Sequence, residues 1–359
     1  MARQSRTPTE EHVDKIVGHL RKRSSKAQAG PLERFVRLMY ARASAQDLLE
    51  TKIEDLYGAA VGLWKFSETR KPRSPRLRVF TPDMKHDGWA VPRTVVQLVT
   101  EDQPFLVDSV AANLAHAGHS VLFQAHAAMD ILRSPDGKRR DLLDQQSHNP
   151  GKICEAVMHL EVQGVATPAR VKEITRLIRD VVADIRSAVE DWRPMRDLLD
   201  RTIDTIKRSP PPLGEEGVAE SIAFLEWMRD GHFTFLGCRE YSYSFKKNSD
   251  AFKATEKMGL GILRDPKVHV LAGDNGLAAI SDEVRDFLTR PELLIVTKTK
   301  ARSRIHRIVN MDYIGVKRYG KGGQVIGEMR FVGLFTATAY NCTVDTIPLL
   351  RSKVAHTIR

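Results

Sequence analysis

One long amphipathic helix is the strongest constraint that this sequence places on its fold. Thr167 and Pro168 supply a cap and a first-turn proline, and apolar side chains then recur with helical period as far as Val189. The stripe consists of Val171, Ile174, Leu177, Ile178, Val181, Val182, Ile185 and Val189. A helix with one such apolar face packs against a second layer, so this segment predicts a layered domain.

The segments before this helix predict the layer that it covers. Strand-like runs rich in β-branched residues occupy 93–100, 121–132 and 153–162. Pro104 opens a helix that Gly118 ends, and a polar linker with a turn at Pro135 precedes the third strand. The resulting βαββα order with an antiparallel sheet is the ferredoxin-like α+β arrangement. We assign it to a first domain over 71–208.

The second half of the chain repeats the same mixture of elements. The run Ser209-Pro210-Pro211-Pro212 predicts a stiff linker over 209–214. A helix through Val218 to Met228 follows, and strands are expected at 232–243, 293–305, 311–319 and 325–338. We therefore expect a second α+β domain over 215–345. Residues 346–359 predict a helix that stops in mid-pattern, which favours a natural chain that continues.

The N-terminal segments differ from the two domains in composition. Residues 1–30 are polar and basic, and we predict a disordered tail there. Residues 31–70 carry apolar side chains at helical spacing and end at a proline-punctuated segment. They predict a helical arm ahead of the first domain.

Composition excludes several classes of protein. The 359 residues carry a net charge of +11, and 42% of them are hydrophobic and 28% charged, which are ordinary globular values. No apolar run is long enough to span a membrane, and the start of the chain lacks the apolar core of a secretory signal. The three cysteines are far apart and odd in number, which is typical of a reducing compartment. We expect a cytoplasmic protein that does not bind membranes.

Motifs that carry catalysis or hold cofactors are missing from the sequence. Gly320–Gly327 only loosely resembles a dinucleotide loop, because Val325 replaces the third glycine and strand-like residues follow, so a glycine hairpin is expected. No Walker-type lysine and no Gly-x-Ser-x-Gly elbow occurs. His116, His119 and His126 do not share a helical face. We predict no catalytic, cofactor-binding or metal-binding residue in this chain.

The turn between the first strand and the first helix of the first domain is the best candidate for ligand binding. Free backbone N–H groups and the helix dipole at such a turn favour a carboxylate, as an amino-acid effector would provide. The alternative is purely structural: Asp108 stabilises the helix dipole and Phe105 anchors the core. The structural alternative is favoured. The candidate effector-binding residues are Asp102, Pro104, Phe105, Asp108 and Ser109.

A row of basic residues is a second candidate. Lys298, Lys300, Arg302 and Arg304 alternate along one expected strand and therefore share a face. They could bind an anion or a phosphate backbone. Protection of an edge strand by charge is the more common use of such a row, and we favour it. An RNA-binding role is disfavoured, because the expected aromatic signature is interrupted at His232.

Several ordered motifs resemble one family, the large bacterial NAD-dependent glutamate dehydrogenases. These motifs run from DLLE (47–50) and EDLYGAA (54–60) through PFLVDS (104–109), VEDWRPM (189–195), FLEW (224–227) and HFTFLG (232–237) to GLGILRD (259–265), MDYIGVK (311–317) and IPLLR (347–351). The resemblance covers nearly everything after about residue 32. It implies the region N-terminal to the catalytic core, built of ACT-type domains with the ferredoxin-like fold.

The resemblance also implies a function. The family oxidises L-glutamate to 2-oxoglutarate and ammonium and passes hydride to NAD. It implies that NAD is bound outside this chain, that a downstream catalytic domain of the same polypeptide is the partner, and that the enzyme is a homo-oligomer. An amino-acid effector is a further implied partner, although Phe105 replaces the glycine usual after Asp-x-Pro in ACT domains. We expect a regulatory and assembly part that is inactive alone; the alternatives are a free-standing amino-acid sensor or scaffold and, less favoured, an RNA-binding module.

Overall fold

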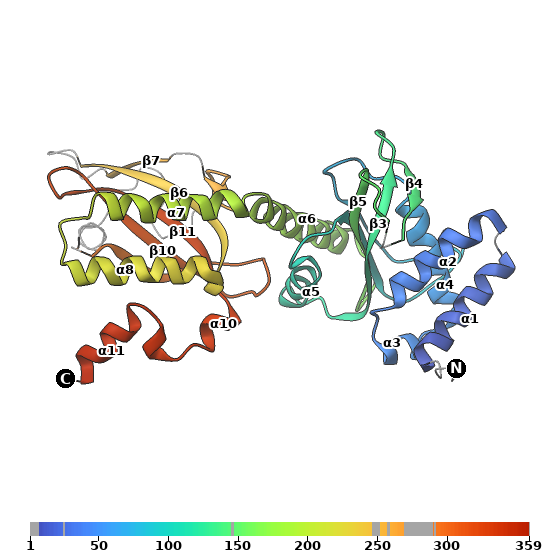
Figure 1. Ribbon diagram of the computed structural model, residues 1–359. Coiled ribbons are helices and arrows are strands. Elements are labelled where there is room, and N and C mark those ends of the chain that lie inside the picture. Colours follow the sequence, from blue (N-terminus) through green and yellow to red (C-terminus); the bar gives the residue numbers. More distant parts are fainter. Residues whose placement is uncertain are drawn as a thin grey trace. The chain divides into compact units, whose positions relative to one another are not determined.

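The chain divides into two compact units, and the division lies inside a helix. In the computed structural model (Figure 1), which describes residues 7–23, 26–144, 147–245, 252–256, 259–268, 290 and 292–358, the units are Met1–Ala183 and Asp184–Arg359. The helix that crosses the division is α6, Pro168–Glu190. The expected limits, 71–208 and 215–345 with a linker at 209–214, differ from this division.

The proline-rich segment has another role in the structure. It joins α7 (Trp192–Arg208) to α8 (Glu215–Trp227), and the two helices pack against each other in the second unit. Helix α7 belongs there because its buried face joins the core of that unit through Met195, Leu199, Ile203 and Ile206. Prolines 210–212 therefore form a turn between two antiparallel helices.

The first unit contains a five-stranded antiparallel sheet. Its spatial order is β1-β2-β5-β3-β4, so β5, the strand that precedes α6 in the sequence, lies between β2 and β3. The strands are β1 (Arg76–Phe80), β2 (Thr94–Glu101), β3 (Val121–Arg133), β4 (Arg139–Leu142) and β5 (Lys152–Val162). Three of them were expected; the two edge strands, β1 and β4, were not.

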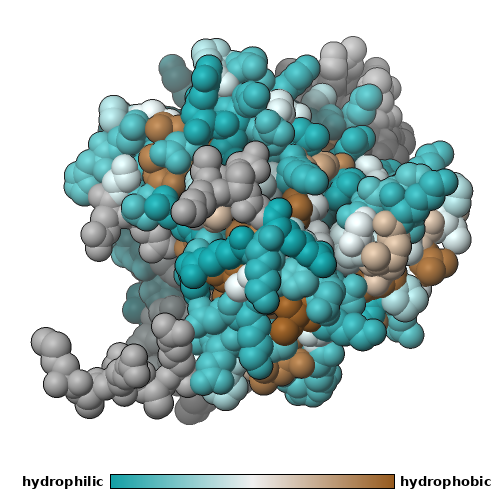
Figure 2. Space-filling model, turned by 90° about the vertical axis from the view of Figure 1, so that its right-hand side faces the viewer, coloured by the Kyte–Doolittle hydropathy of each residue, from teal (hydrophilic) through white to brown (hydrophobic). Residues whose placement is uncertain are grey.

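Helices lie on both sides of this sheet (Figure 1). The four N-terminal helices pack on one face, where they form a core with alternate residues of β3 from Phe123 to Ile131. They are α1 (Pro8–Arg23), α2 (Lys26–Tyr40), α3 (Ala45–Glu50) and α4 (Ile53–Phe66). Helix α5 (Leu106–His116) and the first part of α6 lie on the other side. Figure 2 looks onto the N-terminal helices, where hydrophilic side chains dominate and hydrophobic ones form small separate groups.

The tail expected over residues 1–30 is largely helical. Helix α1 buries Val13, Ile16, Val17 and Leu20 in the core shared with α2 and α4. These four residues form one apolar face, so α1 is amphipathic. The basic residues that suggested a tail lie on the exposed face of the helix and in its last turn.

The second unit pairs one antiparallel sheet with two helices on one face. Its main strand order is β7-β6-β11-β10-β9, and β8 (Leu260–Gly261) pairs with β6. The strands are β6 (Phe233–Phe245), β7 (Phe252–Glu256), β9 (Leu294–Arg302), β10 (Asn310–Tyr319) and β11 (Val325–Phe335). A short π-helical turn, Met228–His232, joins α8 to β6. Short helices α10 (Ala337–Tyr340) and α11 (Leu350–Ile358), with a 3-10 turn at Val344–Thr346, end the chain. The expected class, mixed helices with antiparallel sheets, is confirmed.

Candidate functional site

The strand–helix turn of the first unit has a backbone conformation that is unusual for the residue it holds. Phe105 precedes α5 with φ of 67°, in the left-handed region that favours glycine. Its carbonyl accepts the hydroxyl of Ser109 at 2.5 Å, and the side-chain amide of Asn113 donates to the Ser109 carbonyl at 2.7 Å. The first turn of the helix is therefore held by its own side chains.

The five residues proposed for effector binding differ in their access to solvent. Asp102, Pro104 and Asp108 are exposed, Phe105 is half-buried and Ser109 is buried. The Asp102 amide donates to the Cys154 carbonyl at 2.9 Å, which ties the turn to β5. Burial raises the pKa of the neighbouring Cys154 thiol to about 11, so this cysteine is protonated at neutral pH. The structure thus brings the five residues together, and effector binding there stays a prediction.

The basic row lies along the edge strand of the second sheet and continues past its end. Lys298 pairs with Asp312 on the neighbouring strand at 2.6 Å, and Arg304, beyond β9, pairs with Asp184 at 2.7 Å. Lys300 and Arg302 are exposed. Acidic neighbours thus compensate part of the row, which reduces its attraction for a polyanion. Its anion-binding role remains a prediction.

The glycine-rich segment forms a hairpin between β10 and β11. The Gly320 amide donates to the Gln324 carbonyl at 2.8 Å, and the Gly323 amide donates to the Gly320 carbonyl at 3.0 Å. Gly323 has φ of 79°, which a side chain would disfavour. A strand follows the turn, where a dinucleotide loop would have a helix. The hairpin expected here is confirmed.

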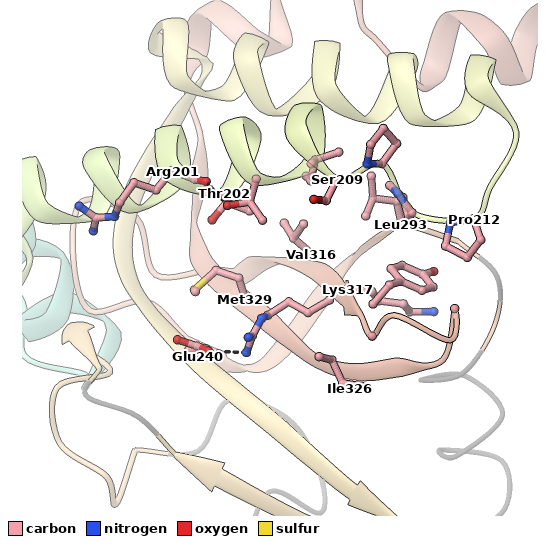
Figure 3. Close-up of a pocket in the computed structure, with 18 of the residues that line it drawn as sticks. Arg201, Thr202, Ser209, Pro212, Glu240, Leu293, Val316, Lys317, Ile326 and Met329 are labelled. Atoms are coloured by element: carbon pink, nitrogen blue, oxygen red, sulfur yellow. Dashed lines mark hydrogen bonds and ion pairs between the residues drawn. The ribbon is translucent and has the colours of Figure 1, made fainter.

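A cavity of about 750 Å³ in the second unit lies between α7 and the sheet (Figure 3). In Figure 3, α7 contributes Arg201 and Thr202, the prolines close one end, and Val316 and Met329 come from the strands. The apolar residues that line it are Leu198, Ile206, Leu293, Val316, Ile326 and Met329. Sequence reasoning missed this site, because α7 was not singled out and its lining residues lie more than a hundred positions apart.

The charged residues around this cavity are mainly cationic. Arg201, Lys317, Arg318 and Lys321 line it, against one carboxylate, Glu240, which pairs with Arg318. Lys317 is almost fully buried, and its ammonium donates to the Arg290 carbonyl at 2.6 Å. Burial lowers the pKa of Lys317 despite the nearby carboxylates of Glu292 and Glu328. Lys317 and Arg318 thus have carboxylates nearby, and Arg201 and Lys321 are exposed to solvent.

The described part of the chain offers little that is typical of other kinds of site. In the part of the chain that the structure describes, no three His, Cys, Asp or Glu side chains gather as a metal site. The three cysteines are free thiols. None of the described helices is both long and apolar enough to cross a membrane.

Comparison with known proteins identifies relatives over most of the chain. The sequence profile described as "Glutamate dehydrogenase, ACT1 domain" matches residues 35–178. The NAD-specific glutamate dehydrogenase of Halomonas elongata is 31% identical over 346 residues, which is 95% of this chain and 21% of that protein. The enzyme of the same name from Pseudomonas aeruginosa is 30% identical, over 90% of this chain and 20% of its own length. The chain therefore spans about a fifth of these relatives.

More distant matches add little. The NAD-specific glutamate dehydrogenase of Mycobacterium tuberculosis is 25% identical over 72% of this chain and 15% of its own length. Among solved structures, an RNA-binding light-oxygen-voltage receptor aligns over 89% of this chain and 88% of its own, with 8% identity and a TM-score of 0.19. That likeness is too weak to carry an argument about fold or function.

Proposed function

Since this chain belongs, over 95% of its length, to the family of NAD-specific glutamate dehydrogenases, we propose that it is the N-terminal regulatory and assembly region of such an enzyme. The observation that carries the proposal is the ACT1-domain match to residues 35–178, within a chain that spans about a fifth of its relatives. The complete enzyme would convert L-glutamate, NAD and water to 2-oxoglutarate, ammonium and NADH. The remainder of the polypeptide would then be the main partner of this region.

The strand order of the first unit supports an ACT-type, ferredoxin-like assignment. Strands β2 and β3 are joined through α5 and are separated in the sheet by β5, which is antiparallel to both. This is the split βαβ arrangement of the ferredoxin-like fold. Strand β1 closes the free side of β2. The N-terminal helices cover the second face of the sheet.

The glycine-rich segment at 320–327 does not fit a nicotinamide dinucleotide. The glycine-rich segment that comes nearest to a phosphate cradle is a hairpin whose amides of Gly320 and Gly323 are used within the turn. No helix begins after it to supply an N-terminus for the pyrophosphate. We therefore place NAD and the hydride transfer in the part of the enzyme outside this chain.

This placement is tested with the purified chain, L-glutamate and NAD. The expected result is no formation of NADH, measured by absorbance, above the rate without protein. A complete glutamate dehydrogenase of the family serves as the positive control. Turnover by this chain above the blank would contradict the proposal.

The regulatory and assembly roles are tested by separate measurements on the same chain. Isothermal titration with glutamate, aspartate and arginine tests the turn at Asp102–Ser109, with Asp102→Asn as the variant and Asp136→Asn, in another exposed turn, as its control. Light scattering coupled to size exclusion tests self-association. The complete chain is used, because α1 belongs to the core of the first unit. A strict monomer at all concentrations would contradict pairing between copies.

A further inference from the structure

The outer edge of the second sheet presents backbone groups that no described strand binds. Strand β9 lies at the end of the strand order, where it pairs with β10 alone among the described strands. The Lys317 amide donates to the Leu293 carbonyl at 2.9 Å, so the backbone groups of Leu293 and of every second residue after it face β10. The groups of the residues between them, Leu294, Val296 and Lys298, therefore point away from the sheet.

Solvent reaches this edge. Val296 is 47% exposed, Thr297 is exposed, and the Lys298 side chain is 53% exposed. The register between β9 and β10 becomes irregular beyond Lys298, so the regular stretch of the edge is 294–298 and Val296 is its centre. An open edge with an exposed β-branched residue at its middle is suited to pairing with another strand.

Opposite charges flank the regular stretch symmetrically. Glu292 and Lys300 lie just outside it, four residues on either side of Val296, and both are exposed. In an antiparallel pair of two β9 strands centred on Val296, Lys300 is opposite Glu292 of the partner subunit, and Val296 is opposite the same residue of the partner. Even spacing places these side chains on one face, where the two valines contact each other between two ion pairs.

Charge disfavours the neighbouring registers. Outward-pointing backbone groups occur at every second residue, so the pairing can shift only by centring on Leu294 or on Lys298. Centring on Lys298 places this lysine opposite itself, and centring on Leu294 places it opposite the exposed Arg290 of the partner subunit. Like charges directly opposite each other destabilise a sheet. The basic residues of β9 therefore select one register and protect the edge against the others.

We propose that two copies of this chain pair through β9, antiparallel and centred on Val296, so that their second sheets form one continuous sheet. The inference rests on the assembly role within the proposed function and names the surface that serves it. The outward groups of Leu294, Val296 and Lys298 then form about six backbone hydrogen bonds between the copies. Such a small interface predicts a reversible dimer that dissociates at micromolar concentrations.

Sedimentation equilibrium of the complete chain measures this dimer, and charge reversal tests its register. Glu292→Lys and Lys300→Glu each place like charges opposite at two symmetry-related positions and should weaken dimerisation about tenfold. The double variant restores opposite charges with exchanged signs and should recover most of the affinity. Lys267→Glu is the control, because Lys267 is exposed on the loop after β8, which pairs with β6 and not with β9. Circular dichroism verifies that each variant is folded.

Cysteine cross-linking locates the axis of the pair. Val296→Cys places two thiols opposite each other at a Cα separation of about 5.5 Å, which a disulfide can bridge. Val309→Cys is the control, because Val309 is 42% exposed but lies outside β9. Both are made in a chain with Cys154→Ser and Cys342→Ser, and the remaining Cys238 is buried. Mild oxidation should link the first variant into dimers and leave the second monomeric on a denaturing gel.

The outcomes separate this inference from the assembly role itself. Dimers that form equally well in Glu292→Lys and in the unsubstituted chain, with no disulfide at position 296, would overturn the β9 interface and assign assembly to another surface. Weakened dimers that the double variant does not recover would overturn the register. A chain that is monomeric at every concentration would overturn both the inference and pairing between copies.

Discussion

Two glycines of α4 show how strongly packing at one residue depends on its neighbours. A Cβ built on Gly58 would lie 2.4 Å from the Cβ of Trp89, a residue that is 1% exposed. A Cβ on Gly62, one turn further, would meet its nearest atom, the Trp89 indole nitrogen, at 3.6 Å, which is an ordinary contact. The same helix thus contains one glycine that the fold needs and one that it does not.

We predict opposite effects for the two substitutions. Gly58→Ala should lower the free energy of unfolding by about 1–3 kcal/mol, because Trp89 has to move within a close-packed core. Gly62→Ala should raise it by about 0.5–1 kcal/mol through better helix propensity. Urea denaturation followed by circular dichroism measures both. A Gly58→Ala protein as stable as Gly62→Ala would show that Trp89 is not held in this position.

At Phe105 the residue type and the backbone geometry disagree, and only one of them can be seen in the sequence. The family resemblance implies a glycine at this position, and the sequence has an aromatic residue in its place. The φ of 67° is nevertheless in the left-handed region that glycine favours. This conformation costs a residue with a Cβ about 1–2 kcal/mol. Such a conformation depends on surrounding contacts, so residue type alone could not predict it.

At the scale of elements, four long apolar segments were predicted well, whereas the short edge strands and the helices α1 and α7 were not. Strands β2, β3 and β5 and helix α6 lie within a few residues of their expected limits, because each buries a long apolar pattern. Strand β1 was missed because it is short and carries two arginines, Arg76 and Arg78, over the ring of Phe66. Helix α1 was missed because its basic composition outweighed a four-residue stripe.

One acidic residue of α8 binds the start of the C-terminal helix α11. Glu220, on α8, accepts from the Arg351 guanidinium at 2.5 Å and from the Leu349 amide at 3.0 Å. These contacts, chiefly the one with Arg351, lower the pKa of Glu220 from 4.5 to about 2. At a pH above about 4.5, the ionised Glu220 therefore stabilises the folded state. This contribution is lost as the pH falls from about 4.5 through 2.

We therefore predict that the attachment of α11 depends on this carboxylate. The amide resonance of Leu349 should titrate with a midpoint near 2 and not near 4.5. At neutral pH, Glu220→Gln should speed trypsin cleavage after Lys353, because the uncharged amide binds Arg351 more weakly. Glu226→Gln is the control, since Glu226 lies on the same helix as Glu220 and pairs with Lys207 on α7. Equal cleavage of the two variants would show that other contacts hold the helix.

At the scale of the whole molecule, the sequence did not reveal the division between the units, because the division lies inside a helix. Helical pattern runs from Pro168 to Arg208 with only a short break at Asp191, which links α6 to α7. Three consecutive prolines were a much stronger signal in the sequence, yet they form a turn between two helices of one unit. Which core each part of a helix joins is decided by contacts between distant residues, so local pattern could not place the boundary.

Separate sheets and cores should make the two units unfold separately, and a buried ion pair of the first unit provides the test. Glu155 is fully buried, and its carboxylate accepts from Arg70 at 2.8 Å and from Arg133 at 2.6 and 2.7 Å. Glu155→Gln removes the nearest counter-charge of two buried guanidinium groups, of which Arg70 keeps Glu101 at 3.5 Å, and should destabilise the first unit by about 3–5 kcal/mol. Glu68→Gln removes a partner of Lys138 that is 54% exposed, and should change stability by less than about 1 kcal/mol.

Hydrogen exchange measured by mass spectrometry reads the two units in one experiment. In Glu155→Gln, amides of β3 and β5 should lose protection, while those of β10 and β11 should keep it, because the latter belong to a different core. The Glu68→Gln protein should match the unsubstituted chain in all four strands. A parallel loss in both sheets would mean that the units unfold as one cooperative structure, with α6 transmitting the loss of the first core to the second.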